Sequence, residues 1–254
     1  MRDRVLRFFD RAHDVEGARR AVRAAREAGF ENVNVDLLFG VPGQTEAEWR
    51  ADLEVALDLE PDHVSLYDLM YEPGTTFRRW LDRGWIAPLP EETCAALYRT
   101  AIEVAERRGL RRYEISNFAR PGRECRHNLV YWRNEPYVGV GCGAASYVAG
   151  ERFRNHPLVE PYLEAVVRGE APLVERETLP PERRLGESIF LGLRLAEGVD
   201  RARLLDETGL DVEVARAEPL ARERERGLVE YDGRRLRLTP RGLLLGDAVA
   251  SSFL

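Results

Sequence analysis

Residues 32–39 read NVNVDLLF and alternate polar with apolar side chains, and the turn sequence GVPG follows at residues 40–43. A period of two predicts a β-strand, because successive side chains of a strand point to opposite faces. One face would carry Asn32, Asn34 and Asp36, while the opposite face is apolar. Strands of an open doubly wound sheet are covered on both faces and read as continuous apolar runs. The alternation therefore favours a barrel whose polar interior is a binding site.

The elements around this strand alternate between helix and strand. Apolar residues at helical spacing predict helices over residues 14–28 and 91–108, each ended by a glycine. Thr45 and Glu48 have the spacing of a capping box and open another helix. Two more strands are expected, over residues 63–70 and 112–118. This order predicts an α/β fold in which a parallel sheet with crossover helices forms a portion of a (β/α) barrel.

Three strands do not close a barrel, and an unpaired sheet edge would remain. Either another chain completes the sheet, as in a homodimer, or the chain is a piece of a longer protein. We expect the second arrangement, and we interpret Met1 as an internal start or as the product of a truncated gene model.

The alternation stops after Gly143, and the C-terminal region is organised differently. A connecting helix is expected over residues 157–168, followed by a linker that contains Pro and Glu and reaches Pro181. Three helices and a hairpin then predict a small α+β domain of the winged-helix type. The helices are expected over residues 183–195, 201–207 and 212–226, the hairpin over 228–238, and a last helix after Thr239 and Pro240. The expected domains are a partial barrel over residues 1–150, a connection over residues 151–181 and a winged-helix-like domain over residues 182–254.

Composition limits the function. All 38 basic residues are Arg, so any chemistry that needs a lysine is excluded, and the net charge of -6 argues against a nucleic-acid binder. Arg234, Arg235 and Arg237 on the expected wing could contact DNA, but the acidic residues of the preceding helices favour a solvated surface. No apolar run approaches the roughly 18 residues of a membrane span, so we expect a cytoplasmic protein. The three cysteines fit neither a disulfide framework nor a zinc ribbon and are expected as reduced thiols: Cys94, Cys125 and Cys142.

The stretch over residues 113–146 holds the most unusual chemistry. His127 is followed by Tyr131 and Trp132, a pattern that suits an aromatic pocket for a flat ligand in which the imidazole binds iron. The alternative is that His127 is a hydrogen-bonded packing residue and that the aromatic side chains belong to the core. A glycine-rich run, residues 139–143, is only a weak signal for phosphate.

Residues 34–45 and 113–146 resemble the radical S-adenosylmethionine proteins of the HemN and HemW group, and the resemblance extends over nearly the whole chain. The element His127, Asn128, Tyr131 and Trp132 is similar to the heme-chaperone branch of this group. The resemblance implies a protein that binds heme as cargo, with His127 on the iron, and delivers it to acceptor proteins. One alternative is an oxygen-independent coproporphyrinogen III oxidase-like enzyme of porphyrin biosynthesis, and a second is a winged-helix nucleic-acid-binding protein.

The resemblance also implies a partial S-adenosylmethionine site made by Arg11, Asp36 and Met70. A carboxylate of the ligand suits an Arg, and its amine and ribose hydroxyls suit an Asp. Without the resemblance, Arg11 would be a surface residue and Asp36 a capping or core hydrogen-bonding residue. The family holds a [4Fe-4S] cluster on a Cys-x-x-x-Cys-x-x-Cys motif, and this motif is absent from the sequence. We therefore expect no catalytic residues and no turnover by this chain alone.

Overall fold

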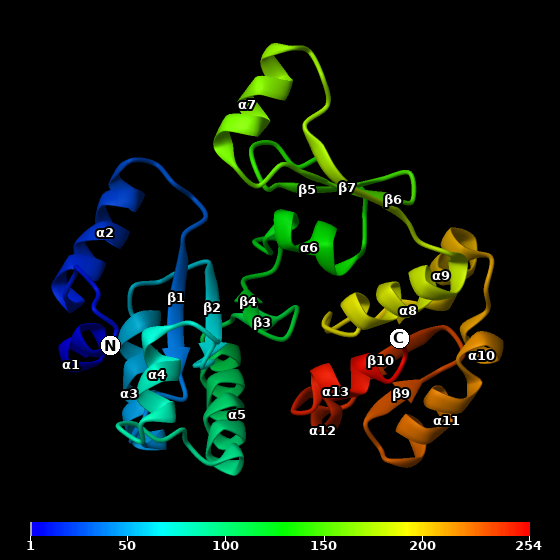
Figure 1. The fold of residues 1–254 in the computed structure, drawn as a ribbon. Coiled ribbons are helices and arrows are strands. Elements are labelled where there is room, and N and C mark those ends of the chain that lie inside the picture. Colours follow the sequence, from blue (N-terminus) through cyan, green and yellow to red (C-terminus); the bar gives the residue numbers. More distant parts are fainter. Residues whose placement is uncertain (1) are drawn as a thin grey trace. The chain divides into compact units, whose positions relative to one another are not determined.

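The computed structural model describes residues 2–254, so the expectation about Met1 lies outside the described residues. The chain forms two compact units, one that ends at Glu124 and one that begins at Cys125 (Figure 1). The predicted domain boundaries at 150 and 181 remain a prediction. Within the region of the chain that is described, no helix is long and apolar enough to cross a bilayer.

The first unit alternates helices with strands, as the sequence predicts. In chain order its elements are α1 (Asp3–Phe8), α2 (Val15–Glu27), β1 (Asn34–Phe39), α3 (Glu46–Leu57), β2 (His63–Asp68), α4 (Thr76–Asp82), α5 (Glu91–Arg107), β3 (Arg111–Arg112) and β4 (Asn117–Ala119).

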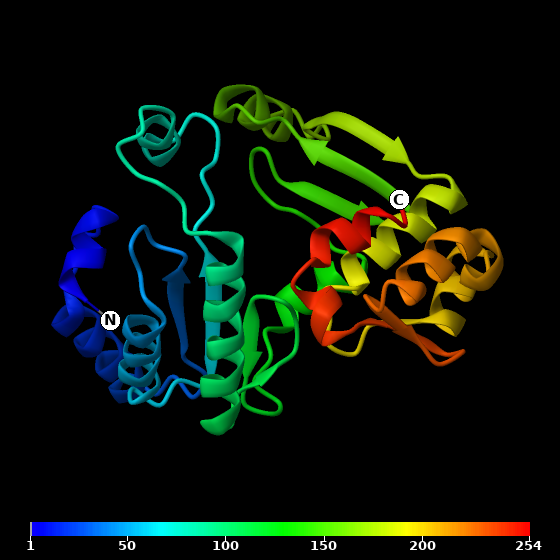
Figure 2. The same cartoon turned by 90° about the horizontal axis from the view of Figure 1, so that it is seen from below.

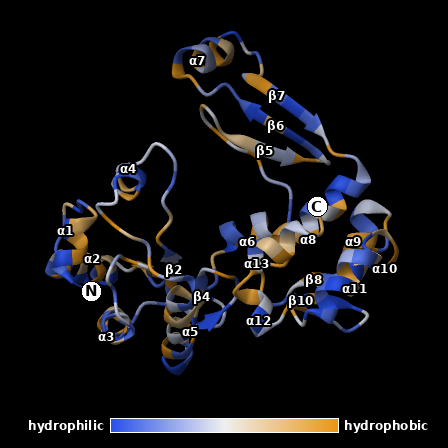
Figure 3. Cartoon of the chain, turned by 60° about the horizontal axis from the view of Figure 1, so that its bottom comes forward, coloured by the Kyte–Doolittle hydropathy of each residue, from blue (hydrophilic) through white to orange (hydrophobic). Residues whose placement is uncertain are grey.

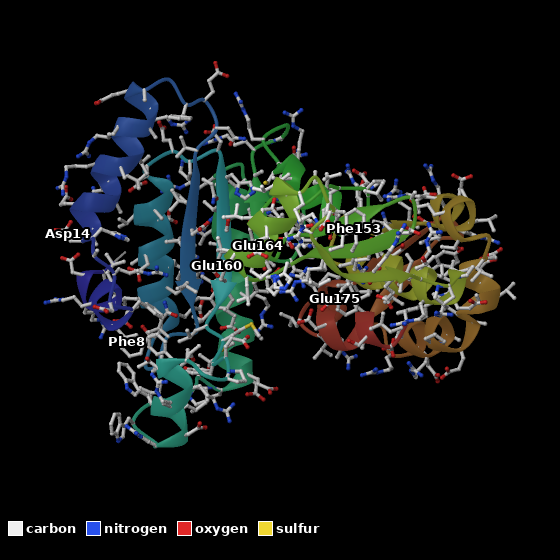
Figure 4. All side chains as sticks on the ribbon, turned by 45° about the horizontal axis from the view of Figure 1, so that its top comes forward. Phe8, Asp14, Phe153, Glu160, Glu164 and Glu175 are labelled. Carbon is white, nitrogen blue, oxygen red and sulfur yellow. The ribbon has the colours of Figure 1, made fainter. Side chains whose placement is uncertain are left out.

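Local chemistry explains where these helices begin and end. Asp14 caps α2 by accepting a hydrogen bond from the backbone N–H of Gly17 at 2.6 Å (Figure 4). Thr45 and Glu48 form the predicted capping box at the start of α3. Gly109 follows α5 with a φ of +80°, a left-handed conformation that favours glycine.

The strands of this unit form one sheet in the order β1-β2-β4-β3. β1 and β2 are parallel, and Asn34 lies opposite His63 in their register. The prediction of a third parallel strand over residues 112–118 is wrong, because β4 runs antiparallel to both β2 and β3. The chain turns sharply between β3 and β4: the backbone N–H of Tyr113 donates to the carbonyl of Asn117, and the Glu114 carboxylate accepts from the backbone N–H of Ser116.

Helices α3 and α5 lie on the same side of β1 and β2 (Figure 2). The side chains of Leu53, Leu97 and Ala101 are fully buried there. Trp49 is buried with them, and its indole N–H donates to the carbonyl of Leu97 at 3.0 Å. The apolar side chains of the sheet are thus covered by helices, and the polar side chains of β1 lie on the opposite face.

The second unit is a mixed α+β structure. Its elements are α6 (Arg126–Trp132), β5 (Ala145–Val148), β6 (Glu151–Asn155), α7 (Val159–Val167), β7 (Leu173–Thr178), α8 (Pro181–Gly192), β8 (Val199–Asp200), α9 (Arg201–Thr208), α10 (Val212–Ala215), α11 (Ala217–Glu225), β9 (Val229–Tyr231), β10 (Arg235–Leu238), α12 (Pro240–Leu243) and α13 (Gly246–Ser251).

A three-stranded antiparallel sheet has the order β5-β6-β7. Its strands β6 and β7 lie within residues 151–181, which the sequence predicts to be a connection, and β5 lies just before them. The expected helix is present as α7, but the expected linker contains β7, so the linker prediction is wrong at this point. Every residue of β7 is exposed. β6 and β7 are mostly hydrophilic (Figure 3), so they lack the apolar periodicity by which strands are recognised in a sequence.

The C-terminal region has the predicted winged-helix-like elements. α8 and α9 match the first two expected helices, while the third is interrupted at Arg216 and forms α10 and α11. β9 and β10 form the predicted hairpin, and β8 pairs with β10 as a third strand. A buried apolar cluster holds these elements together and includes Leu185, Ile189, Leu204, Leu228 and Phe253.

Candidate functional site

The polar face of the first sheet carries a connected set of side chains. β1 contributes Asn34 and Asp36, and β2 contributes His63 and Ser65, which lie opposite them in the parallel register. Asn34 donates from Nδ2 to Oδ1 of Asp36 at 2.7 Å. Its Oδ1 lies 2.7 Å from Nδ1 of His63 and accepts from the Ser65 hydroxyl at 3.3 Å. The alternating sequence of β1 therefore produces the polar face that was predicted, and β2 extends it.

His63 lies at the centre of this set and is only 4% exposed. Its Nε2 lies 2.8 Å from the Tyr113 hydroxyl, and the two rings pack edge to face with centroids 5.5 Å apart. Burial lowers the pKa of His63 below its ordinary value, against the opposite effect of the Asp36 and Glu124 carboxylates. The imidazole is therefore neutral at neutral pH, with one donor and one acceptor nitrogen.

Sequence reasoning missed His63 and Tyr113 as site residues. The alternation that identified Asn34 and Asp36 carries no information about which residues pair with them across the sheet. The available signal was the pair His63 and Ser65, two polar residues at a spacing of two within an apolar strand. Such a spacing places both side chains on one face of the strand.

The three residues of the predicted S-adenosylmethionine site lie in the first unit at separate places. Asp36 is exposed on the polar face, and Met70 is 70% exposed just after β2. Arg11 is exposed between α1 and α2, where it lines an open cavity of about 550 Å³ together with Arg7, His13 and Arg20. Neither Asp36 nor Met70 lines that cavity. Within residues 2–254 no hydrogen bond or ion pair connects the three, so their common site stays a prediction.

In the second unit, α6 carries the residues predicted to bind heme. His127 is exposed and packs edge to face against Tyr131, with ring centroids 4.9 Å apart. Tyr131 in turn packs against Tyr137 with centroids 4.7 Å apart. The i to i+4 spacing of His127 and Tyr131 places them on the same side of the helix. The result is a row of three rings that ends in an exposed imidazole.

Trp132 lies on a different side of α6, because five helical positions after His127 correspond to a rotation of about 140°. The guanidinium of Arg194 lies over the indole ring, 4.5 Å from the ring centroid. The indole Nε1 is buried and has no hydrogen-bond partner among the described residues. Asn128 is half-buried. The structure therefore places His127 and Tyr131 together but packs Trp132 against Arg194, just after α8, and the heme role of these residues stays a prediction.

The glycine-rich run after Tyr137 packs against the β5-β6-β7 sheet. A Cβ atom at Gly139 would overlap the carbonyl oxygen of Ala145. The backbone N–H of Gly139 donates to the Ser146 hydroxyl at 2.9 Å, and the Asn155 amide donates to the carbonyl of Gly141 at 2.9 Å. These contacts give the glycines a structural role that requires no phosphate.

The cysteines do not assemble a metal site within the described region of the chain. None of the three forms a disulfide, and residues 2–254 contain no cluster of three His, Cys, Asp or Glu side chains able to hold a metal ion. Burial raises the pKa of the Cys94 thiol, and the Asp68 carboxylate acts in the same direction. The residues present do not fit a [4Fe-4S] cluster, which needs thiolate ligands close together.

The wing arginines are engaged by acidic side chains. Arg234 pairs with Asp200 at 3.2 Å, and Arg237 pairs with Glu230 at 3.1 Å. Arg235 lies 3.7 Å from both Glu197 and Asp200. Such ion pairs are typical of a solvated surface, and they leave less positive charge available to the phosphates of a nucleic acid.

The comparisons with known proteins agree with this architecture. The family model for the HemN C-terminal domain matches residues 179–245. The heme chaperone HemW of Bacillus subtilis is 35% identical over 252 residues, which cover 99% of this chain and 66% of that protein. The heme chaperone HemW of Synechocystis is 42% identical over 205 residues, which cover 80% of this chain and 50% of that protein.

A solved structure shows the same fold. Coproporphyrinogen III oxidase (HemN) from Escherichia coli, described as a radical SAM enzyme, matches with a TM-score of 0.77 at 21% identity, over 100% of this chain and 62% of that one. The chain spans between half and two thirds of the length of the HemW proteins of Bacillus subtilis and Synechocystis. The relatives and the C-terminal family match agree with the shared fold, and the chain belongs to the radical SAM HemN/HemW family.

Proposed function

We propose that this chain carries the heme-binding portion of a HemW-type heme chaperone, which binds heme and delivers it to acceptor proteins. The relatives at 34–42% identity that align over most of the chain bear the name heme chaperone HemW. The observation that carries the proposal is the exposed His127 imidazole at the end of the ring row with Tyr131 and Tyr137.

The chemistry of this ring row suits a porphyrin. A neutral imidazole nitrogen is a common axial ligand of heme iron, and aromatic rings offer apolar contact area to a flat macrocycle. Val138 and Val140, in the loop after Tyr137, are 71% and 87% exposed. They add apolar surface to the same segment. A ligand bound at an exposed surface can be passed to another protein without opening a closed pocket.

The proposal includes a portion of an S-adenosylmethionine site in the first unit, with Asp36, Arg11 and Met70 as contacts. The exposed carboxylate of Asp36 fits an amine or hydroxyl donor of that ligand. No step through a [4Fe-4S] cluster is derived, because the described residues do not fit one. We also propose a cytoplasmic location, in which free thiols such as Cys94 stay reduced.

The two other functions have less support. Porphyrinogen oxidation rests on the fold shared with the Escherichia coli enzyme, and a fold does not determine a function. Nucleic-acid binding rests on the winged-helix-like elements, whose arginines pair with acidic residues. DNA binding in a mobility-shift assay that weakens as the salt concentration rises would favour the nucleic-acid-binding function.

A transfer experiment tests the chaperone function. The chain is loaded with hemin, freed of unbound hemin by gel filtration and mixed with apomyoglobin, and heme movement is followed by the absorption spectrum. The proposal expects retention of hemin through gel filtration and its release to apomyoglobin. Failure to load, or loading without release, would contradict it.

A further inference from the structure

Four side chains on the polar face of the first sheet form one continuous chain of hydrogen bonds. It runs from Tyr113 through His63 and Asn34 to Asp36, with separations of 2.8, 2.7 and 2.7 Å between consecutive polar atoms. Tyr113 follows β3, His63 opens β2, and the other two lie on β1 (Figure 1). Residues far apart in the sequence are thus joined by the sheet.

The carboxylate at one end fixes the direction of every hydrogen bond. A carboxylate only accepts, so the atom of Asn34 that faces Asp36 is its NH₂ group. The oxygen Oδ1 of Asn34 then faces His63, and Nδ1 of His63 must carry the hydrogen. Nε2 of the neutral imidazole is left with its lone pair and accepts from the Tyr113 hydroxyl. The Ser65 hydroxyl, which donates to the same Oδ1, agrees with this assignment.

Burial differs along the chain of hydrogen bonds. His63 is buried, whereas Asn34 and Asp36 are exposed. The second carboxylate oxygen of Asp36, Oδ2, accepts no hydrogen bond from residues 2–254 and is available to a ligand. An exposed carboxylate normally samples several rotamers, and a rigid partner reduces that freedom. His63 is the buried group that can hold Asn34, and through it Asp36, in one orientation.

We propose that His63 is a positioning residue: it fixes the Asn34 amide, which holds Asp36 so that Oδ2 is presented to a ligand with N–H or O–H donors. The amine and the ribose hydroxyls of S-adenosylmethionine are such donors. This inference rests on the ligand role of Asp36 in the proposed function. The hydrogen-bond chain itself does not depend on that role, so the two are tested separately.

The first experiment reads the tautomer of His63 by ¹⁵N NMR of histidine-labelled protein, without any ligand. The wild type is expected to show a protonated Nδ1 and an unprotonated Nε2. In Asp36→Asn the new amide can donate or accept, so both directions of the hydrogen-bond chain are allowed and a mixture of the two tautomers is expected. Asn32→Ala is the matched control, because Asn32 also lies on the polar side near the start of β1 but bonds to the carbonyl of Arg123.

The second experiment measures S-adenosylmethionine binding by equilibrium dialysis. An Asn side chain places its amide near the position of Nδ1, whereas a Gln side chain places it near Nε2. His63→Asn should therefore keep the donor to Asn34 and bind with the wild-type affinity. His63→Gln should bind S-adenosylmethionine about tenfold more weakly, a change of the size expected when a ligand loses one hydrogen bond to a carboxylate such as that of Asp36. Circular dichroism of both variants checks that each is folded.

Each outcome decides one element of the inference. A wild-type His63 protonated at Nε2 overturns the hydrogen-bond chain. Equal affinities of folded His63→Asn and His63→Gln overturn the positioning role. A wild-type protein that binds no S-adenosylmethionine, with the expected tautomer intact, overturns the ligand role of Asp36 and with it the S-adenosylmethionine site of the proposed function.

Discussion

The imidazole of His127 lies edge-on to the phenol ring of Tyr131, with ring centroids 4.9 Å apart and an interplanar angle of 82°. This geometry is a favourable arrangement for two aromatic rings, and it limits the orientations that the imidazole can adopt. A histidine held in this way presents its ring nitrogens in a defined direction on the surface of α6.

Replacing Tyr131 tests the contribution of this contact to heme binding. Tyr131→Phe keeps the ring and should bind hemin with an affinity close to that of the wild type. Tyr131→Leu removes the ring and should weaken binding by up to about tenfold, since such a ring pair contributes roughly 0.5–1.5 kcal/mol. Hemin titration followed by absorption measures both. Equal affinities for the two variants would show that the ring contact does not matter.

Trp132 is expected to act on stability more than on heme. Its indole ring packs under the Arg194 guanidinium and is half-buried. Trp132→Ala should lower the free energy of unfolding of the second unit by about 2 kcal/mol, since both packing and the cation–π contact are lost. Urea unfolding followed by circular dichroism measures the change. A large loss of hemin affinity with unchanged stability would instead place Trp132 at the porphyrin.

Gly139 is predicted to be intolerant of any side chain. Gly139→Ala places a Cβ atom against the carbonyl of Ala145, so the loop and β5 must separate, which costs roughly 1–3 kcal/mol. Gly17→Ala is the matched control, because its nearest neighbour is a side-chain oxygen at 3.1 Å. Thermal unfolding should show a lower midpoint for Gly139→Ala and little change for the control. A shift of the same size in both would count against the predicted overlap.

His63 should make stability depend on pH. Its pKa is lowered in the folded protein by burial, while the unfolded chain keeps the ordinary value of 6.5. As the pH falls below about 6.5, the unfolded chain binds a proton that the folded protein resists, so the free energy of unfolding decreases until the folded pKa is reached. Asp36, Glu124 and the Tyr113 hydroxyl are the groups that face this imidazole.

The measurement is urea unfolding at a series of pH values from 7.5 to about 5, a window set by the ordinary histidine pKa. The wild type should lose stability toward the acidic end, and His63→Asn should lose less over the same window. Parallel pH profiles for the two proteins would show that His63 stays uncharged in both states or titrates equally in both.

Much of the fold follows from local sequence chemistry. The alternation in β1, the capping box of Thr45 and Glu48, and the glycine after α5 each specify one element through interactions within a few residues. The hairpin around Asp232 and Gly233 is of the same kind. These predictions are confirmed, since interactions between neighbouring residues are enough to specify each of these elements.

The features that sequence analysis missed depend on pairing between distant residues. β7 is exposed along its length, so its pairing with β6 leaves no hydrophobic period in the sequence. The direction of β4 depends on the turn before it, where the Glu114 carboxylate accepts a hydrogen bond from the backbone N–H of Ser116 and the chain reverses. His63 joins the site only because the β1–β2 register places it opposite Asn34.

The most direct test of heme binding through His127 is a hemin titration of the whole chain, followed at the Soret band, with His127→Ala and His13→Ala measured beside it. His13 is the matched control because it is also exposed. We expect one hemin to bind per chain with a histidine-ligated spectrum, and we expect this binding to be lost in His127→Ala and retained in His13→Ala. A folded wild-type protein that binds no hemin, or a His127→Ala variant that binds with the wild-type affinity and spectrum, would contradict this expectation.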